Sequence, residues 1–273
     1  MTLSLPALHP RTVLGFGRHD LRLLFNLTNM ALRDRFLGSG VGRVWALLNP
    51  LLLLLIFSFV FSFVFKSRLP GADNSLSFII WLISGYGPWL AISEGLSTSA
   101  SSIIGNSGLV KNLSFKCELL PMAASLLGLV PLGVSFLLLA VLLALGGHAP
   151  TAAWLIIPLV LVLQFTLITG LGLFLGAINV FVRDVTQILP NLLVVLLFAS
   201  PIFYSVDAFP EGLQFWVQLN PFYLVSNGYR VPLMYGVLPP LWQLALLTAI
   251  ALAMQVGGLA YFRRLKGYFD ARL

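Results

Sequence analysis

The residues that could carry out chemistry are few and far apart along this chain of 273 residues. None of its four lysines follows a glycine, so the sequence lacks the Gly-Lys-Ser/Thr loop that binds ATP phosphates. The three histidines are scattered, without the spacing of a metal site. The nine acidic residues never cluster, whereas a membrane-bound transferase needs grouped carboxylates. The pattern predicts neither a catalytic residue nor a metal site in this chain.

The composition indicates whether the chain folds in water or in a membrane. Hydrophobic residues make up 59% of the chain and charged residues 9%, with a mean hydropathy of +0.96. A soluble domain carries about 25% charged residues, so a soluble enzyme and a disordered chain are both excluded. The chain has a net charge of +7 but no hydrophilic domain that could present a basic face to phosphates, which argues against nucleic-acid binding. The single cysteine excludes a disulfide framework. The chain is predicted to be a polytopic membrane protein.

Six segments have the roughly 20 mostly apolar residues that cross a bilayer. They are residues 46–65, 77–97, 122–145, 154–180, 186–204 and 241–262. The sequence therefore predicts an all-α membrane domain over 46–262, with a cytoplasmic segment before it (1–45) and a cytoplasmic tail after it (263–273). Segments that would face the cytoplasm hold 13 of the 16 basic residues. The positive-inside rule then places both termini in the cytoplasm, in a multi-pass protein of the inner (plasma) membrane.

The segment before the first span has an amphipathic pattern. Residues 14–45 are too charged to span, yet Leu21, Phe25, Leu32 and Phe36 share one helical face. This predicts a helix in the cytoplasmic interface, with its cations near lipid headgroups. A cytosolic helix packed on a partner is the alternative. The basic residues assigned to the interfacial helix are Arg18, Arg22, Arg33, Arg35 and Arg43.

The outer segment 205–240 is also unusual, because it is hardly polar. It holds many large apolar side chains, interrupted by Pro210, Pro221, Pro232 and Gly236. A water-exposed loop rarely carries so many. The segment is predicted to form short re-entrant helices between the fifth and sixth spans, since irregular backbone at membrane depth is tolerated where protein buries it.

One acid, Glu94, lies within a predicted span. A buried acid suggests a proton relay, because a charge at the bilayer centre costs about 2.5–3.5 kcal/mol on insertion scales. However, Glu94 lies near the cytoplasmic end of the second span, where water or a basic partner is within reach. A structural role is therefore favoured.

Three phrases of the sequence, in order, resemble polysaccharide-exporting ABC permeases, the ABC type-2 exporter group that includes O-antigen, teichoic acid and capsule transporters. Residues 33–50 resemble that family's entry into the first span. Residues 109–121 are similar to its loop before the third span, with Lys116 where the family usually has proline. Residues 179–222 resemble the part from the fourth span to the outer segment. The resemblance covers approximately residues 30–262.

This resemblance implies a homodimeric permease subunit without enzymatic activity. Two copies would pair with two copies of a separately encoded nucleotide-binding ATPase subunit, which would bind ATP and Mg, and would export lipid-linked polysaccharide. The resemblance assigns coupling to the ATPase to a cytoplasmic loop and a turn. The coupling residues it implies are Lys111, Lys116, Glu118, Arg183 and Asp184. Ordinary positive-inside anchoring is the alternative for these charges.

The substrate path is predicted from aromatic residues. Rings can stack on the apolar C–H faces of sugars without fixing a register, which suits a moving polymer. The candidate channel residues are Trp81, Tyr86, Trp89, Phe198, Phe203, Tyr204, Phe222, Tyr223 and Tyr229. The alternative is an aromatic belt at the membrane interface. The Gly85–Pro88 break predicts a bent, pore-facing helix, and Arg230 is a candidate contact for a lipid diphosphate.

Three other functions stay open at this point. An ABC permease for a small hydrophobic molecule or drug should depend on one apolar pocket. An ion-coupled carrier should respond to an ion gradient and to loss of Glu94. A membrane-bound glycosyl- or phosphotransferase is disfavoured by the scattered carboxylates.

Overall fold

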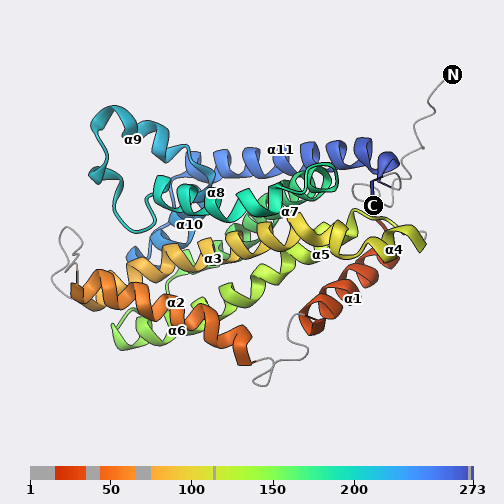
Figure 1. The fold of residues 1–273 in the computed structure, drawn as a ribbon. Helices are drawn as coiled ribbons and strands as arrows, with labels where there is room; N and C mark the ends of the chain where they lie inside the picture. The colour runs from red at the N-terminus through yellow and green to blue at the C-terminus, as the bar shows by residue number, and fades with distance from the viewer. Residues whose placement is uncertain (1–15, 35–43, 65–74, 113–114, 270–271) are drawn as a thin grey trace.

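The structure is a computed structural model that describes residues 16–34, 44–64, 75–112, 115–269 and 272–273. Within these ranges the chain is helical and contains no strand, so the predicted all-α class is confirmed (Figure 1). The α-helices are α1 (Arg18–Asp34), α2 (Trp45–Phe59), α3 (Ser75–Gly105), α4 (Ser107–Asn112), α5 (Leu119–Ser125), α6 (Leu129–Leu145), α7 (Ile157–Phe181), α8 (Val185–Ala199), α9 (Glu211–Gln218), α10 (Pro221–Tyr235) and α11 (Leu241–Leu265).

Five helical segments are long and apolar enough to cross a membrane. They are Trp45–Val64, Ser75–Gly105, Leu119–Leu145, Ala152–Phe181 and Leu241–Tyr268. The fifth predicted span, 186–204, corresponds to α8, whose 15 residues rise about 22 Å, less than the hydrocarbon core of about 30 Å. Proline at position 201, just beyond this helix, cannot continue it. Six crossings therefore remain a prediction.

The helix α3 is longer than its predicted span and forms the centre of the bundle (Figure 1). It continues through Pro88 without a break and runs eight residues beyond the predicted end at position 97. Its glycines permit close packing, because a Cβ atom at Gly85 would overlap the guanidinium of Arg230 and one at Gly87 would overlap Ser135. The 85–88 segment is buried, so facing a pore would require it to become exposed.

The helices α7 and α11 lie side by side along one flank of the bundle (Figure 1). Their backbones meet at Gly170 and Gly258, where either glycine would place a Cβ atom inside the other helix's main chain. Nearby, Thr169 donates a hydrogen bond of 2.7 Å to the Oε1 atom of Gln255. Small residues that let two backbones approach, with a polar contact beside them, are the usual basis of helix association in membranes.

The amphipathic helix before the first span is present as α1. Leu27 is buried against the bundle, where α1 packs on α5, whereas Leu21 and Phe25 are exposed. Of the predicted apolar face, Leu21 and Phe25 therefore point away from the described protein, as an interfacial helix requires, whereas Leu32 is partly buried. Phe36, Arg35 and Arg43 lie outside the described residues, so their part of the prediction stays untested.

The outer segment contains two different helices. The helix α10 packs against α3, α7 and α11, and ten of its residues are buried. The helix α9 has no buried residue and exposes Leu213, Phe215 and Trp216. Asn220 caps α10 by accepting a hydrogen bond from the Phe222 amide, and Gly236 ends it in the left-handed conformation.

Candidate functional site

A buried acid joins two helices at one end of the bundle. Glu118 directly precedes α5 and is only 1% exposed. Its Oε1 atom accepts hydrogen bonds from Arg263 Nε at 3.3 Å and Lys266 Nζ at 3.0 Å, both at the end of α11. Its Oε2 atom has no hydrogen-bond partner among the described residues. These two hydrogen bonds hold the chain before α5 against the end of α11. Removing either partner would leave an uncompensated charge.

A second ion pair fixes the same segment to α1. Lys116 Nζ lies 2.6 Å from Asp20 Oδ2, which also accepts the Gly17 amide at 2.7 Å. Lys116 and Arg263 both lie near the Phe16 ring, at 5.3 Å and 5.7 Å from its centroid. Residues 115–118, which we call the clamped segment, are therefore held between α1 and α11.

Both acids of the clamped region are ionised at neutral pH. Burial alone would raise the pKa of the Glu118 carboxyl, but hydrogen bonds from its own backbone, Lys266 and Arg263 lower it below its ordinary value. The pKa of Asp20 is lowered in the same way, where contacts with Lys116 and the Gly17 amide outweigh burial. Because both pKa values fall on folding, these contacts stabilise the fold at neutral pH and lose that effect as the pH drops through the folded-state values.

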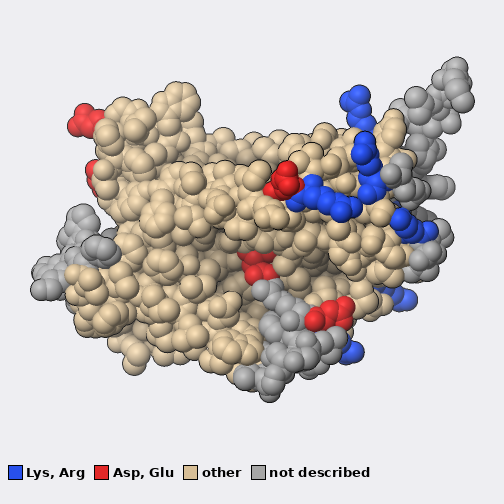
Figure 2. Space-filling view, in the orientation of Figure 1, with Lys and Arg blue, Asp and Glu red and all other residues tan. Residues whose placement is uncertain are grey.

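The other predicted coupling residues are exposed. Lys111 lies on α4, and Arg183 and Asp184 form the turn between α7 and α8. Lysine and arginine side chains gather at this end of the molecule, which we call the basic end (Figure 2). The opposite end carries Asp207 and Glu211 on the segments around α9. Thus Lys111, Arg183 and Asp184 are available to another protein, whereas Glu118 acts within this chain.

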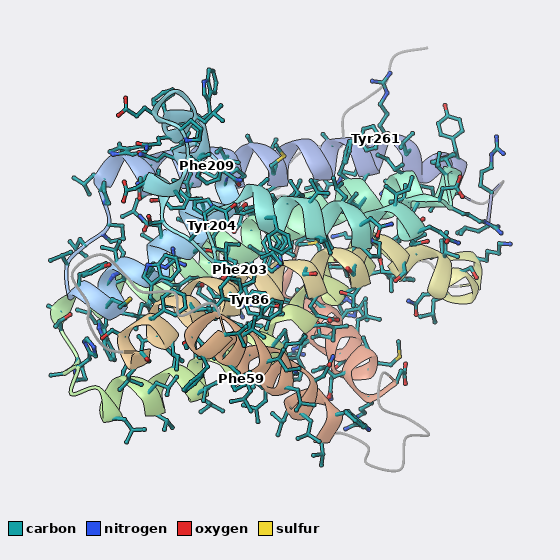
Figure 3. The ribbon with its side chains drawn as sticks, turned by 60° about the vertical axis from the view of Figure 1, so that its left-hand side comes forward. Phe59, Tyr86, Phe203, Tyr204, Phe209 and Tyr261 are labelled. Carbon is teal, nitrogen blue, oxygen red and sulfur yellow. The ribbon has the colours of Figure 1, made fainter. Side chains whose placement is uncertain are left out.

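Most of the candidate channel aromatics are core residues of the single chain. The buried ones are Trp81, Tyr86, Trp89, Phe203, Phe222, Tyr223 and Tyr229. Phe203 is central: its ring centroid lies 5.0 Å from that of Phe57, 4.9 Å from Phe61 and 5.2 Å from Tyr86. Figure 3 shows Tyr86 and Phe203 next to each other. Phe198 is 52% exposed and Tyr204 is partly exposed. Stacking on a polymer would require the buried rings to become exposed, so their channel role stays a prediction.

Arg230 is enclosed by protein and is not available to a ligand. It is 4% exposed, and its guanidinium lies 3.7 Å from the centre of the Trp81 ring. Its nitrogens donate to three main-chain carbonyls, those of Trp81, Pro201 and Ile202, at 3.3, 3.3 and 2.9 Å. The predicted contact with a lipid diphosphate is not possible in this arrangement. Arg230 instead joins α10 to α3 and to the chain after α8.

We expect Arg230→Lys to destabilise the outer half of the bundle. A lysine cannot reproduce the planar fork that reaches three carbonyls and stacks on Trp81. Each lost charged hydrogen bond costs about 1.5–3 kcal/mol, so the midpoint of thermal unfolding in detergent should fall by several degrees. Arg264→Lys, at an exposed position on α11, should leave the midpoint unchanged. Equal midpoints for the two variants would contradict this role.

The partners of the clamped segment could not be found from the sequence. Glu118 and Arg263 are 145 residues apart, and Lys116 and Asp20 are 96 residues apart. Each of these charged residues, taken alone, looks like one of the charges that ordinarily flank membrane spans. The only sequence signal is that Lys116, Glu118, Arg263 and Lys266 lie just outside predicted spans and Asp20 lies in the predicted interfacial helix.

The chain matches the model of one protein family and is similar to several known proteins. The model of the family described as ABC-2 type transporter matches residues 22–234. The chain is 26% identical over 261 residues to the O-antigen export system permease protein RfbA of Klebsiella pneumoniae, covering 92% of this chain and 96% of the relative. It is 28% identical to the protein of the same name from Myxococcus xanthus, over 85% of this chain and 88% of the relative. It is 27% identical to the polysialic acid transport protein KpsM of Escherichia coli, over 85% and 89%.

Proposed function

The chain belongs to the ABC-2 type transporter family, and we propose that it is the permease subunit of an ATP-driven exporter of lipid-linked cell-surface polysaccharide. The observation that carries this proposal is the match, over 85–92% of the chain, to relatives named for O-antigen export and polysialic acid transport. These relatives are transporters of glycans, which favours a polymer over the small hydrophobic molecule of the main alternative. The resemblance of the three sequence phrases gives the same family.

We propose six crossings of the inner membrane with both termini in the cytoplasm. The gathering of lysine and arginine at the basic end supports this orientation, because positive loops stay cytoplasmic. The helix α8 rises about 22 Å, and the turn that follows it, over residues 200–204, would have to complete the crossing. The buried helix α10 then forms the core of a re-entrant outer segment, with its polar groups satisfied by α3 and α7.

We propose that two copies of the chain act with two copies of a separate ATPase subunit that binds ATP and Mg. Supporting this, the described chain leaves apolar side chains exposed on the Trp45–Val64 segment and on α8, among them Phe59, Phe63 and Phe198, which lipid or a second copy can cover. The ATPase would press on Lys111 and on the Arg183–Asp184 turn. The clamped segment would pass that movement to α1 and α11, because ion pairs hold it to both.

Reversing a charge on the exposed turn should uncouple export. We expect Arg183→Glu to lower polysaccharide export about tenfold or more, because a like charge against the partner costs several kcal/mol in a complementary interface. The protein should still insert and unfold at the normal temperature, since Arg183 is exposed. Glu211→Lys, a reversal at the opposite end, is the matched control. Export and copurification of the ATPase are both measured, and normal values for Arg183→Glu would refute coupling at this turn.

A deletion strain tests the substrate directly. Cells that lack this chain should accumulate lipid-linked glycan on the cytoplasmic side and lose it from the surface, and the intact gene should restore export. Export of a small hydrophobic compound, with normal surface glycan, would instead support the drug-permease alternative. Export that follows an ion gradient and fails with Glu94→Gln would support the carrier alternative.

A further inference from the structure

A polar groove penetrates the bundle between α1 and α2 on one side and α3 with α5 and α6 on the other. It consists of two adjoining hollows, with cavity volumes of about 490 and 590 Å³, that share Glu94, Ser97 and Leu127. The space-filling view shows acidic side chains within a hollow on this face (Figure 2). We call this feature the serine groove and define it by Trp45, Asn49, Ser93, Glu94, Ser97 and Ser101.

The floor of the serine groove is one stripe of α3. Ser93, Ser97 and Ser101 follow each other at four-residue intervals, so they lie on one helical face over about 12 Å. Six hydroxyl-bearing residues occur between positions 93 and 102, within a helix that otherwise qualifies as a membrane span.

The hydroxyl run of α3 divides into a packing side and a groove side. Thr98 and Ser99 donate hydrogen bonds to the main-chain carbonyls of Ala124 and Pro121, at 2.8 and 2.9 Å, and so fasten α3 to α5. Ser93, Ser97 and Ser101 line the groove, which Thr98 also borders. Helix packing therefore accounts for one side of the run and not for the other. A stripe of polar residues that lines a cavity beside a membrane span is typical of a substrate path or a water-filled cavity.

The remaining groups of the serine groove are those that bind sugars. Asn49 and Glu94 offer an amide and a carboxylate, which with the serines can donate to and accept from sugar hydroxyls. Trp45 supplies an aromatic ring for a C–H face, and apolar side chains such as Leu53 and Leu90 line the rest. The described lining of the groove holds no lysine or arginine to bind a diphosphate, so the sugar of a lipid-linked glycan fits this groove better than its phosphates do.

We propose that the serine groove binds the sugar portion of the lipid-linked glycan next to its lipid anchor as the substrate enters from the cytoplasmic leaflet. This inference rests on the proposed function and adds the site at which the glycan is recognised. It also gives Glu94 a role other than proton relay: its carboxylate accepts hydrogen bonds from sugar hydroxyls.

Site-directed labelling tests the proposal, and the chain is well suited to it because Cys117 is its single cysteine. In a Cys117→Ser background that still exports, Ser97→Cys is made in the complete complex with its ATPase partner. Inverted membrane vesicles are treated with a membrane-impermeant maleimide, alone or with a polyprenyl diphosphate that carries an oligosaccharide. Sugar-free polyprenyl diphosphate is the second probe. Ser101→Cys serves as a second site if Ser97→Cys is poorly folded, and Arg264→Cys, exposed on α11 and outside the groove, is the control.

The proposal predicts that the glycan lipid slows labelling of Ser97→Cys about tenfold when present at ten times its dissociation constant. The sugar-free lipid should not slow it, and neither lipid should affect Arg264→Cys. Equal protection by both lipids would show that the groove binds the anchor, and no protection in vesicles that export glycan would show that it binds neither; each result overturns the sugar site. Vesicles that do not export glycan at all would instead refute the proposed function.

Discussion

Replacing Gly258 with alanine is expected to remove most of the folded protein. The new Cβ atom would overlap the main-chain oxygen of Gly170, which no rotamer change can move aside. Overpacking of a tight interface costs about 1–3 kcal/mol when side chains can adapt, so a clash with backbone should exceed that range. The separation of α7 and α11 would also stretch the Thr169–Gln255 hydrogen bond. The measurement is the yield of monodisperse protein in mild detergent and its midpoint of unfolding.

The neighbouring glycine provides the control for this substitution. A Cβ atom at Gly257 would meet nothing within 4 Å, and alanine favours a helix over glycine by about 1 kcal/mol in soluble hosts. Gly257→Ala should therefore match or slightly exceed the native midpoint. If Gly258→Ala were as stable as Gly257→Ala, the close approach of α7 and α11 would be wrong.

Replacing Glu118 with glutamine should weaken both stability and coupling. The carboxylate is buried and accepts from two cations, and hydrogen bonds to charged groups contribute about 1.5–3 kcal/mol. Arg263 and Lys266 are partly exposed and can turn to water, so we expect a loss of about 2 kcal/mol. Because the clamped segment would then be held to α1 alone, export should fall further than ATP hydrolysis. The unfolding midpoint, ATP hydrolysis and export are measured together.

The pH dependence gives an independent check of the clamp. The pKa of Glu118 is lowered on folding, so the stability that it supplies is present at neutral pH and is lost as the pH falls through the folded-state value. The difference in unfolding midpoint between the native chain and Glu118→Gln should therefore shrink under acidic conditions. Glu211→Gln, an exposed acid at the opposite end, should show no difference at either pH. A constant difference for Glu118→Gln across pH would contradict an ionised clamp.

Hydropathy predicted the helical class and five of the spans because the need to bury backbone groups in lipid leaves few alternatives to helices. Hydropathy gave the wrong helix ends where a helix continues beyond its apolar run or stops before the run is complete. The helix α3 continues to Gly105, although residues 98–105 were expected in a loop, and hydroxyls in this stretch bond to carbonyls of the same helix, as Ser102 does to Ser99. The short α8 shows the opposite case, an apolar run that reaches position 204 in the sequence but whose helix ends at Ala199.

The structure shows the exposure of the predicted coupling residues, and their coupling role stays a prediction. The charges Lys111, Arg183 and Asp184 lie at the exposed positions that coupling to a partner requires. The internal role of Glu118 depended on α11, whose proximity no local pattern reveals. Likewise, aromatic residue type alone could not separate a core ring such as Tyr229 from an exposed one such as Phe198, because both serve burial in an apolar medium.

The central claim, that this chain is a permease driven by a separate ATPase to export lipid-linked glycan, has one direct test. The tagged chain, expressed with its neighbouring reading frames, is purified in mild detergent and reconstituted with lipid-linked oligosaccharide. We expect a stoichiometric ATPase subunit to copurify and the lipid-linked oligosaccharide to stimulate ATP hydrolysis. A chain that purifies alone, without ATP hydrolysis, and still moves its substrate along an ion gradient would contradict the account.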